Sequence, residues 1–226
     1  MSRLRLVVFD VDGTLADSQA EIVAAMGAAF AGESHDAPDR AAILSIVGLS
    51  LDQAMARLAP HLPPARQARL VAGYRQAYFE QRRVNGASPL YPGVRALLDE
   101  LAHDPFLLMG VATGKSKRGL DALVEAHGLE RFFVTRQVAD FHPSKPHPAM
   151  LVAALGEAGV RPRDAVMVGD TSFDMEMARS AGVGALGVGW GYHAPETLVA
   201  DRVVHHMTEL PGAVTWTLNL KGENRS

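Results

Sequence analysis

The chain has no cysteine among its 226 residues, and its 22 basic side chains do not outnumber its 25 acidic ones. Without cysteine there is no disulfide framework, no thiolate metal site and no cysteine nucleophile. The formal net charge of −3 leaves no basic surplus to neutralise nucleic-acid phosphates, so no nucleic-acid partner is expected. Small molecules are the expected partners.

Long apolar runs are also missing. No stretch approaches the length of a transmembrane helix, and the first residues lead into a strand without the basic and apolar regions of a signal peptide. We therefore expect a cytoplasmic protein without a membrane partner. Hydrophobic residues at 48% and charged residues at 21% are typical of a globular protein with a packed core.

The most informative stretch is residues 7–14, which read Val-Val-Phe-Asp-Val-Asp-Gly-Thr. Its apolar start predicts a strand buried on both faces, with Asp10 and Asp12 at its carboxyl end. Two such carboxylates lose hydration and repel each other unless a cation or a reaction uses them. The stretch indicates a functional site, although Asp12-Gly13 alone is also a common turn pair.

Later in the chain, short apolar runs alternate with amphipathic helical patterns, which predicts an α/β core with a parallel sheet and flanking helices. Strands are predicted over residues 106–112, 132–134, 165–168 and 185–188, with an edge strand over 202–204.

A helical block separates the first strand from the others. Ser18 and Glu21 have capping-box spacing before a first helix, and Pro63-Pro64 opens a longer one. The sequence therefore predicts a helical cap over residues 17–88, inserted into a core formed by residues 1–16 and 89–226.

Three further polar groups join the first pair: Thr113-Gly114, Lys145, and Asp170 with Asp174. Each has an ordinary explanation as a helix cap, a solvated loop lysine or acids of a first helical turn. In an open α/β sheet, however, ligands bind beyond the carboxyl ends of the strands. The convergence of these groups at the carboxyl ends of the strands fits a bound cation and a phosphate better than it fits the separate ordinary explanations.

The residue types indicate phosphoryl transfer. Asp10 is ionised at neutral pH and needs no base to attack phosphorus, provided that a cation screens its charge. Asp10, Asp170 and the backbone carbonyl of Asp12 offer the oxygen ligands that Mg²⁺ prefers. The side chain of Asp12 is then free for proton transfer, and we expect its surroundings to favour protonation more than those of Asp10.

The remaining polar residues have supporting roles in this interpretation. Thr113 and the amide of Gly114 hydrogen-bond phosphoryl oxygens, and Lys145 neutralises their charge. Asp174 orients Lys145 or a metal-bound water.

These motifs, in this order, resemble the four motifs of the haloacid dehalogenase superfamily. The helical block lies where the small cap is inserted in its phosphoglycolate-phosphatase-like branch. The resemblance implies a Rossmann-like core, Mg²⁺ dependence and an aspartyl-phosphate intermediate on Asp10. Members that dehalogenate acids lack the second aspartate, Asp12 here, so the resemblance implies a phosphatase acting on a small phosphorylated metabolite.

The cap is expected to read the leaving group. Gly48 and Ser50 resemble a substrate-facing loop of the family, and Arg75 and Arg82 flank the apolar stripe of the long helix. Lys115, directly after Thr113-Gly114, is a further candidate for substrate contact. Residues 33–88 contain seven arginines and five acids, and this excess suits a carboxylate-bearing ester, with phosphoglycolate as the first candidate.

Other functions stay open. A phosphomutase of the β-phosphoglucomutase type is disfavoured by Thr14 and by Gly169-Asp170, while an inorganic pyrophosphatase of the same branch fits the motifs. Residues 110–116 are similar to a nucleotide-binding P-loop but have three residues between the glycines instead of four. A receiver-like signalling module has no place for the inserted block. The oligomeric state is not indicated.

Overall fold

The computed structural model describes residues 3–223 and is built around one parallel sheet in the strand order β3-β2-β1-β4-β5-β6. The strands are β1 (Arg5–Phe9), β2 (Leu107–Thr113), β3 (Phe133–Val138), β4 (Ala165–Gly169), β5 (Gly184–Val188) and β6 (Arg202–Val204). The first strand pairs with β2 on one side and β4 on the other, so it lies inside the sheet. The predicted α/β class and the edge strand β6 are confirmed.

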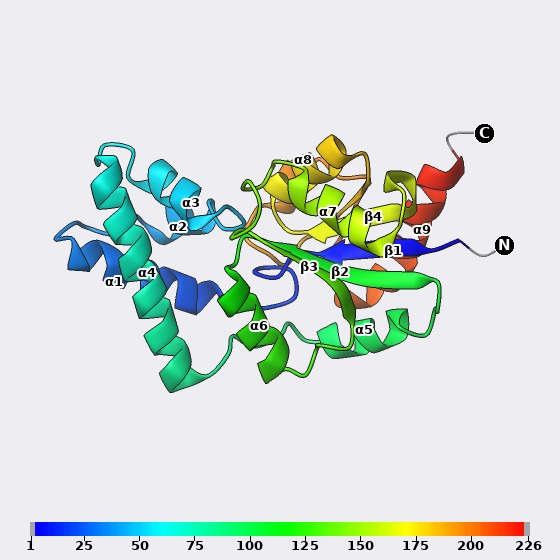
Figure 1. Ribbon diagram of the computed structural model, residues 1–226, viewed down its shortest axis with the longest axis horizontal. Helices are drawn as coiled ribbons and strands as arrows, with labels where there is room; N and C mark the ends of the chain where they lie inside the picture. The colour runs from blue at the N-terminus through cyan, green and yellow to red at the C-terminus, as the bar shows by residue number, and fades with distance from the viewer. Residues whose placement is uncertain (1–2, 224–226) are drawn as a thin grey trace.

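Helices cover both faces of this sheet (Figure 1). Val7 and Phe9 of β1 pack toward one helical layer, and Leu6 and Val8 pack toward the other. The first layer contains α5 (Val94–Leu101), α6 (Lys117–Ala126) and α9 (Leu210–Glu223), and the second contains α7 (Ala149–Ala158) and α8 (Ser172–Ala181). Burial on both faces explains why β1 is an uninterrupted apolar run.

The helical block lies beyond the carboxyl ends of the strands, on the left in Figure 1. It contains α1 (Gln19–Gly32), α2 (Arg40–Leu44), α3 (Leu51–Leu58) and α4 (Pro64–Asn85). Met26 of α1 and Leu70 of α4 belong to one hydrophobic cluster, which Phe173 of α8 joins from the core. The expected helical character is confirmed, and the domain boundaries themselves stay a prediction.

Three local features differ from the expected pattern. The side chain of Ser18 makes no capping hydrogen bond at the start of α1 and contacts Asp12 instead. Strand β3 is longer than predicted because its buried Thr135 and Gln137 interrupt the apolar pattern. Helix α9 has no predicted counterpart, since Pro211-Gly212 in its first turn is also a loop signal.

No helix within residues 3–223 combines the length and the apolar character needed to cross a bilayer.

The packing of α9 against the sheet is testable with Leu210→Ala. Leu210 is only 1% exposed, so its truncation leaves a cavity and should lower the free energy of unfolding by about 2–5 kcal/mol. Thr215→Ala changes an exposed position of the same helix and should stay within about 0.5 kcal/mol. Urea unfolding of both variants measures the difference, and equal effects would contradict a packed α9.

Candidate active site

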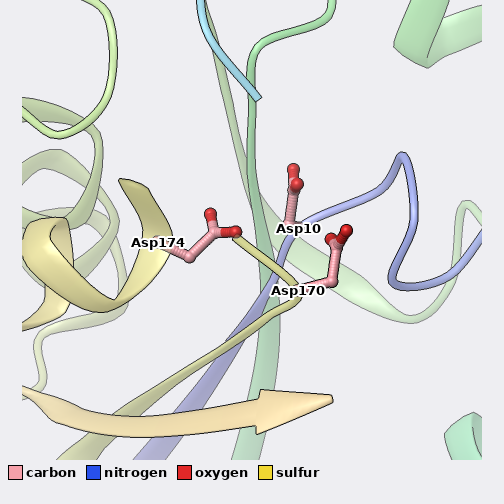
Figure 2. Close-up of side chains that lie close together, drawn as sticks. All are labelled: Asp10, Asp170 and Asp174. Atoms are coloured by element: carbon pink, nitrogen blue, oxygen red, sulfur yellow. The ribbon is translucent and has the colours of Figure 1, made fainter. Parts of the chain in front are cut away.

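Three buried carboxylates meet at the carboxyl ends of two neighbouring strands (Figure 2). Asp10 follows β1, Asp170 follows β4, and Asp174 lies in the first turn of α8. One oxygen from each lies within 4.8 Å of the others. Because β1 and β4 pair directly, the sheet itself brings Asp10 and Asp170 together.

The hydrogen bonds distinguish the three acids. Asp174 Oδ1 accepts a hydrogen bond from the Lys145 ammonium at 2.7 Å. Its Oδ2 accepts from the Thr171 amide at 3.1 Å and from the Thr171 hydroxyl at 2.7 Å. Asp170 accepts one hydrogen bond on each oxygen, from the Thr14 hydroxyl at 2.8 Å and from the Tyr192 amide at 2.9 Å.

Asp10 is the least satisfied of them. Its Oδ1 lies 2.8 Å from Lys145 Nζ, and apart from this ion pair neither oxygen has a hydrogen-bond partner among residues 3–223. Buried polar atoms are normally paired, so these free lone pairs call for a ligand.

Burial also perturbs the protonation of the cluster. Desolvation is the main reason that the pKa of Asp10 is raised to about 7, with Lys145 opposing the shift and Asp174 adding to it. Desolvation, with repulsion from Asp10, raises the pKa of Asp170 well above its usual range. Burial opposes the charge of Lys145, but the two carboxylates beside it outweigh this cost and raise its pKa.

This donor set fits a hard divalent cation. All three side chains offer oxygen, and Mg²⁺ takes oxygen ligands in preference to nitrogen or sulfur. Asp10 and Asp170 have lone pairs to give, whereas Asp174 already accepts three hydrogen bonds or ion contacts. A cation here would also oppose the desolvation and the mutual repulsion that raise the pKa values of Asp10 and Asp170.

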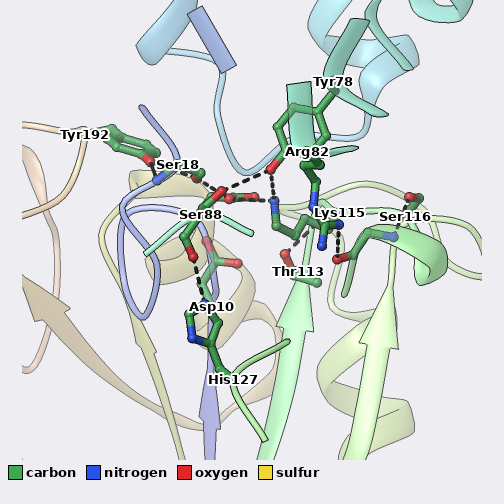
Figure 3. A network of polar contacts seen from close by, with 12 residues as sticks. Asp10, Ser18, Tyr78, Arg82, Ser88, Thr113, Lys115, Ser116, His127 and Tyr192 are labelled. Carbon is green, nitrogen blue, oxygen red and sulfur yellow. Dashed lines mark hydrogen bonds and ion pairs between the residues drawn. The ribbon is translucent and has the colours of Figure 1, made fainter. Parts of the chain in front are cut away.

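Asp12 belongs to a second network of polar contacts with Ser18 and Lys115. Figure 3 shows that this network extends from Lys115 to Tyr78 in the helical block. Asp12 Oδ1 accepts from the Ser18 hydroxyl and lies 2.8 Å from Lys115 Nζ. Lys115 Nζ in turn donates to the Tyr78 hydroxyl of α4 at 3.0 Å. Both of these Asp12 contacts come from donors, and through Lys115 they connect the acid to α4 of the helical block.

Thr113 is the last residue of β2, the strand next to β1, and Gly114 follows it. The Thr113 hydroxyl is buried and accepts from the Lys115 amide at 3.2 Å. A side chain on Gly114 would meet the backbone carbonyl oxygens of Gly48 and Leu49 at 2.6 and 2.7 Å. Glycine is required here because the helical block approaches the core this closely.

A cavity of about 560 Å³ opens onto Asp10 and Asp12 between the core and the helical block. Of the residues expected to bind phosphate or substrate, its wall includes Gly48, Arg75, Arg82, Thr113, Gly114 and Lys115. Ser50 instead lines an adjoining hollow of about 190 Å³, and its amide donates to the Ser144 hydroxyl at 2.8 Å. Lys145, Asp170 and Asp174 are buried behind Asp10 and are not part of the cavity wall.

The sequence analysis missed three contacts of this site. Thr14 holds Asp170, Ser18 holds Asp12, and Tyr78 holds Lys115. Thr14 was detectable because it stands in the same motif as Asp10. Ser18 was hidden by its capping-box spacing, and Tyr78 gave no signal because an aromatic residue on a helix usually belongs to the core.

Comparisons with known proteins agree with this architecture. Residues 7–188 match the family described as haloacid dehalogenase-like hydrolase. A protein of Dickeya dadantii named probable phosphatase IndB is 37% identical, and the match covers 95% of each chain. The phosphoglycolate phosphatase of Yersinia pestis is 31% identical over 93% of each chain. The crystal structure of a predicted phosphoglycolate phosphatase from Haemophilus somnus superposes with a TM-score of 0.82 at 22% identity, covering 94% of this chain and 99% of that one, and supports the fold.

The raised pKa of Asp10 predicts how the metal-free protein responds to pH. An unfolded aspartate titrates near pH ~3.9, whereas Asp10 in the folded protein holds its proton up to about pH 7. The folded state binds more protons between these values, so this contribution to the free energy of unfolding is lost as the pH rises from about 4 to 7.

We expect Asp10→Asn to be more stable than the wild type in the presence of chelator, with a gain that grows by about 1 kcal/mol or more between pH 5 and 7.5. Urea unfolding at both pH values measures this gain. A gain that is the same at both would mean that Asp10 is not protonated by burial.

Proposed function

The chain belongs to the haloacid dehalogenase-like hydrolase family, and we propose that it is a magnesium-dependent phosphatase that hydrolyses small phosphomonoesters through a covalent intermediate on Asp10. The observation that carries the proposal is the Asp10 carboxylate, which is buried, lacks hydrogen bonds on both oxygens and faces the cavity. The names of the relatives in Dickeya dadantii and Yersinia pestis support phosphatase activity.

We assign the nucleophilic attack to Asp10. One of its oxygens forms a bond to phosphorus while the bond from phosphorus to the alcohol oxygen breaks. The ion pair with Lys145 keeps Asp10 oriented, and Asp174 holds Lys145 through a second ion pair. Asp174 thus acts by holding Lys145 and does not need to touch the substrate.

We assign the magnesium site to Asp10, Asp170 and the backbone carbonyl of Asp12. Bound there, Mg²⁺ would screen the negative charge of the phosphoryl oxygens from the attacking carboxylate. Thr14 and the Tyr192 amide orient Asp170 for this purpose. Both contacts leave lone pairs on the Asp170 oxygens.

We assign the phosphate contacts to Thr113, Gly114 and Lys145. The Thr113 hydroxyl and the Gly114 amide follow the strand next to β1, at the same edge of the sheet as Asp10. Donors fixed by the backbone before the substrate arrives stabilise developing charge without reorganisation.

Asp12 is our candidate for proton transfer. It would protonate the leaving alkoxide and then, as a carboxylate, take a proton from the water that attacks the phosphorus of the aspartyl-phosphate. Its ion pair with Lys115 has to be exchanged for this, and Lys115 lines the cavity. We propose that Lys115 turns to the phosphate oxygens when the substrate binds, which releases Asp12 to carry a proton.

The finer expectation of phosphoglycolate as substrate rests on the cap. Arg75 and Arg82 line the cavity, and Arg82 Nε is buried without a hydrogen-bond partner, which suits an acceptor on the leaving group. Gly48 borders the same cavity, whereas Ser50 contributes from the neighbouring hollow only.

The nucleophile is tested with Asp10→Asn. The neutral amide cannot attack phosphorus, so release of phosphate from p-nitrophenyl phosphate with Mg²⁺ should fall by about 10³-fold or more. The exposed Asp36→Asn serves as the matched control and should retain full activity. No turnover by the wild type, with or without Mg²⁺, would remove the phosphatase proposal, and free phosphate as the product argues against a mutase.

The role of Asp12 is tested with Asp12→Asn. Its proposed metal contact is a backbone oxygen, so calorimetry should detect Mg²⁺ binding within about threefold of the wild type while most turnover is lost. If the variant no longer binds Mg²⁺, the Asp12 side chain belongs to the metal site instead.

A further inference from the structure

Tyr192 contacts groups of both the core and the helical block. Its backbone amide donates to Asp170 Oδ2 at 2.9 Å. A Cβ atom on the preceding Gly191 would lie 2.1 Å from the Asp170 Cβ, so the chain passes closely over that acid. From this fixed point the Tyr192 ring packs against the hydrophobic cluster of the helical block, and its hydroxyl reaches Ser18 (Figure 3). One residue thus connects Asp170 with the start of the helical block.

The hydrogen bonds between Tyr192 and Ser18 have one consistent arrangement of donors and acceptors. The Ser18 hydroxyl has a single proton and uses it in a hydrogen bond to Asp12 Oδ1, because an ionised carboxylate can only accept. Ser18 Oγ therefore accepts from the Tyr192 hydroxyl, whose oxygen is 3.1 Å away. The Ser18 amide donates back to that oxygen at 3.3 Å. Tyr192 thus holds Ser18 at two atoms, and Ser18 holds Asp12.

The same contacts distinguish the two oxygens of Asp12. Oδ1 accepts from Ser18 and contacts Lys115, whereas Oδ2 has no hydrogen-bond partner among residues 3–223. Asp12 lines the cavity, so Oδ2 is the oxygen available to a leaving group there. A proton on Oδ2 leaves Oδ1 as an acceptor. The hydrogen bond from Ser18 is therefore compatible with both the ionised and the protonated form of Asp12.

When the substrate binds, this hydrogen bond becomes the main restraint on the Asp12 side chain. In the proposed mechanism Lys115 turns from Asp12 to the phosphate, and Ser18 is the partner that remains. Ser18 is fully buried, and its two hydrogen bonds with Tyr192 hold its hydroxyl in one orientation. Tyr192 is not part of the cavity wall, so it acts through Ser18 and does not touch the substrate. The precision of this restraint matters because a small displacement of a catalytic group lowers the rate steeply.

We propose that the Tyr192 hydroxyl is a positioning group for the proton transfer by Asp12. By fixing Ser18, it keeps Asp12 Oδ2 within reach of the ester oxygen. The proton on Oδ2 passes to that oxygen as the bond from Asp10 to phosphorus forms and the bond from phosphorus to the alcohol breaks. Asp12 is left as a carboxylate that Ser18 still contacts. This inference rests on the proposed phosphatase function and concerns leaving groups that need a proton to depart.

The test is Tyr192→Phe, which keeps the ring and the amide that donates to Asp170 and removes only the hydroxyl. Two esters of similar size are compared, because benzyl phosphate releases a basic alkoxide that needs a proton, whereas p-nitrophenolate departs without one. We expect kcat/KM to fall at least about fivefold more for benzyl phosphate than for p-nitrophenyl phosphate. A loss of the same size for both esters would mean that Tyr192 only ties the helical block to the core, and would overturn the inference.

Tyr91→Phe is the matched control. Tyr91 is also half-buried and lies beside Trp190, with ring centroids 6.4 Å apart, but its hydroxyl has no hydrogen bond to any of residues 3–223. The control should change the ratio of the two kcat/KM values by less than about twofold. A shift as large as that of Tyr192→Phe would mean that loss of any tyrosine hydroxyl near the site has this effect, and would also overturn the inference.

A double-mutant cycle tests whether Tyr192 acts through Ser18. Ser18→Ala removes the hydroxyl between Tyr192 and Asp12 and should shift the ratio at least as far as Tyr192→Phe. Adding Tyr192→Phe to Ser18→Ala should then shift it by less than about twofold more, because both changes break the same connection. Effects that multiply would overturn the inference, since Tyr192 would then act on another group.

The wild type separates this inference from the proposed function. Turnover of both esters with Mg²⁺, combined with an unchanged ratio in Tyr192→Phe, would overturn the positioning role and leave the phosphatase proposal intact. No turnover of either ester by the wild type would overturn both.

Discussion

The ion pair that Lys145 forms with Asp10 and Asp174 is the contact on which the rest of the site depends. Three carboxylates lie around one fully buried ammonium, so the group carries more negative than positive charge when all of it is ionised. That imbalance adds to the desolvation that raises the pKa of Asp10, and it favours either a cation beside the acids or protons on them. Asp174 also accepts from Thr171 at the start of α8, and the same pairing therefore fixes the end of β4 relative to that helix.

A second polar network joins this centre to the helical block. Lys115 connects Asp12 with Tyr78, and Gly114 lets the carbonyls of Gly48 and Leu49 approach the core. The groups that we assign to proton transfer thus touch the elements that form the wall of the cavity. An alcohol that displaces Tyr78 or Lys115 would change the contacts of Asp12, so recognition of the leaving group and proton transfer to it are not independent.

Much of this arrangement was predictable because it depends on the ends of buried strands. The apolar run before Asp10 specified an interior strand, and parallel pairing then required Thr113 and Asp170 to lie beside it. What the sequence did not indicate depends on contacts between distant segments. Helix α9 begins with Pro211-Gly212, which is equally a loop signal, and the partner of Tyr78 is known only when α4 is docked on the core. The position of Ser50 in the adjoining hollow, outside the lining of the main cavity, likewise depends on tertiary packing.

The contact between Ser18 and Asp12 determines where the helical block can be separated from the core without removing a partner of that acid. Ser18 lies in the helical block, directly before α1, yet its hydroxyl donates to Asp12 of the core. A cap grafted from another protein at residue 17 would remove a partner of the acid along with the old cap. A helical block that is exchanged without removing this contact therefore begins after Ser18.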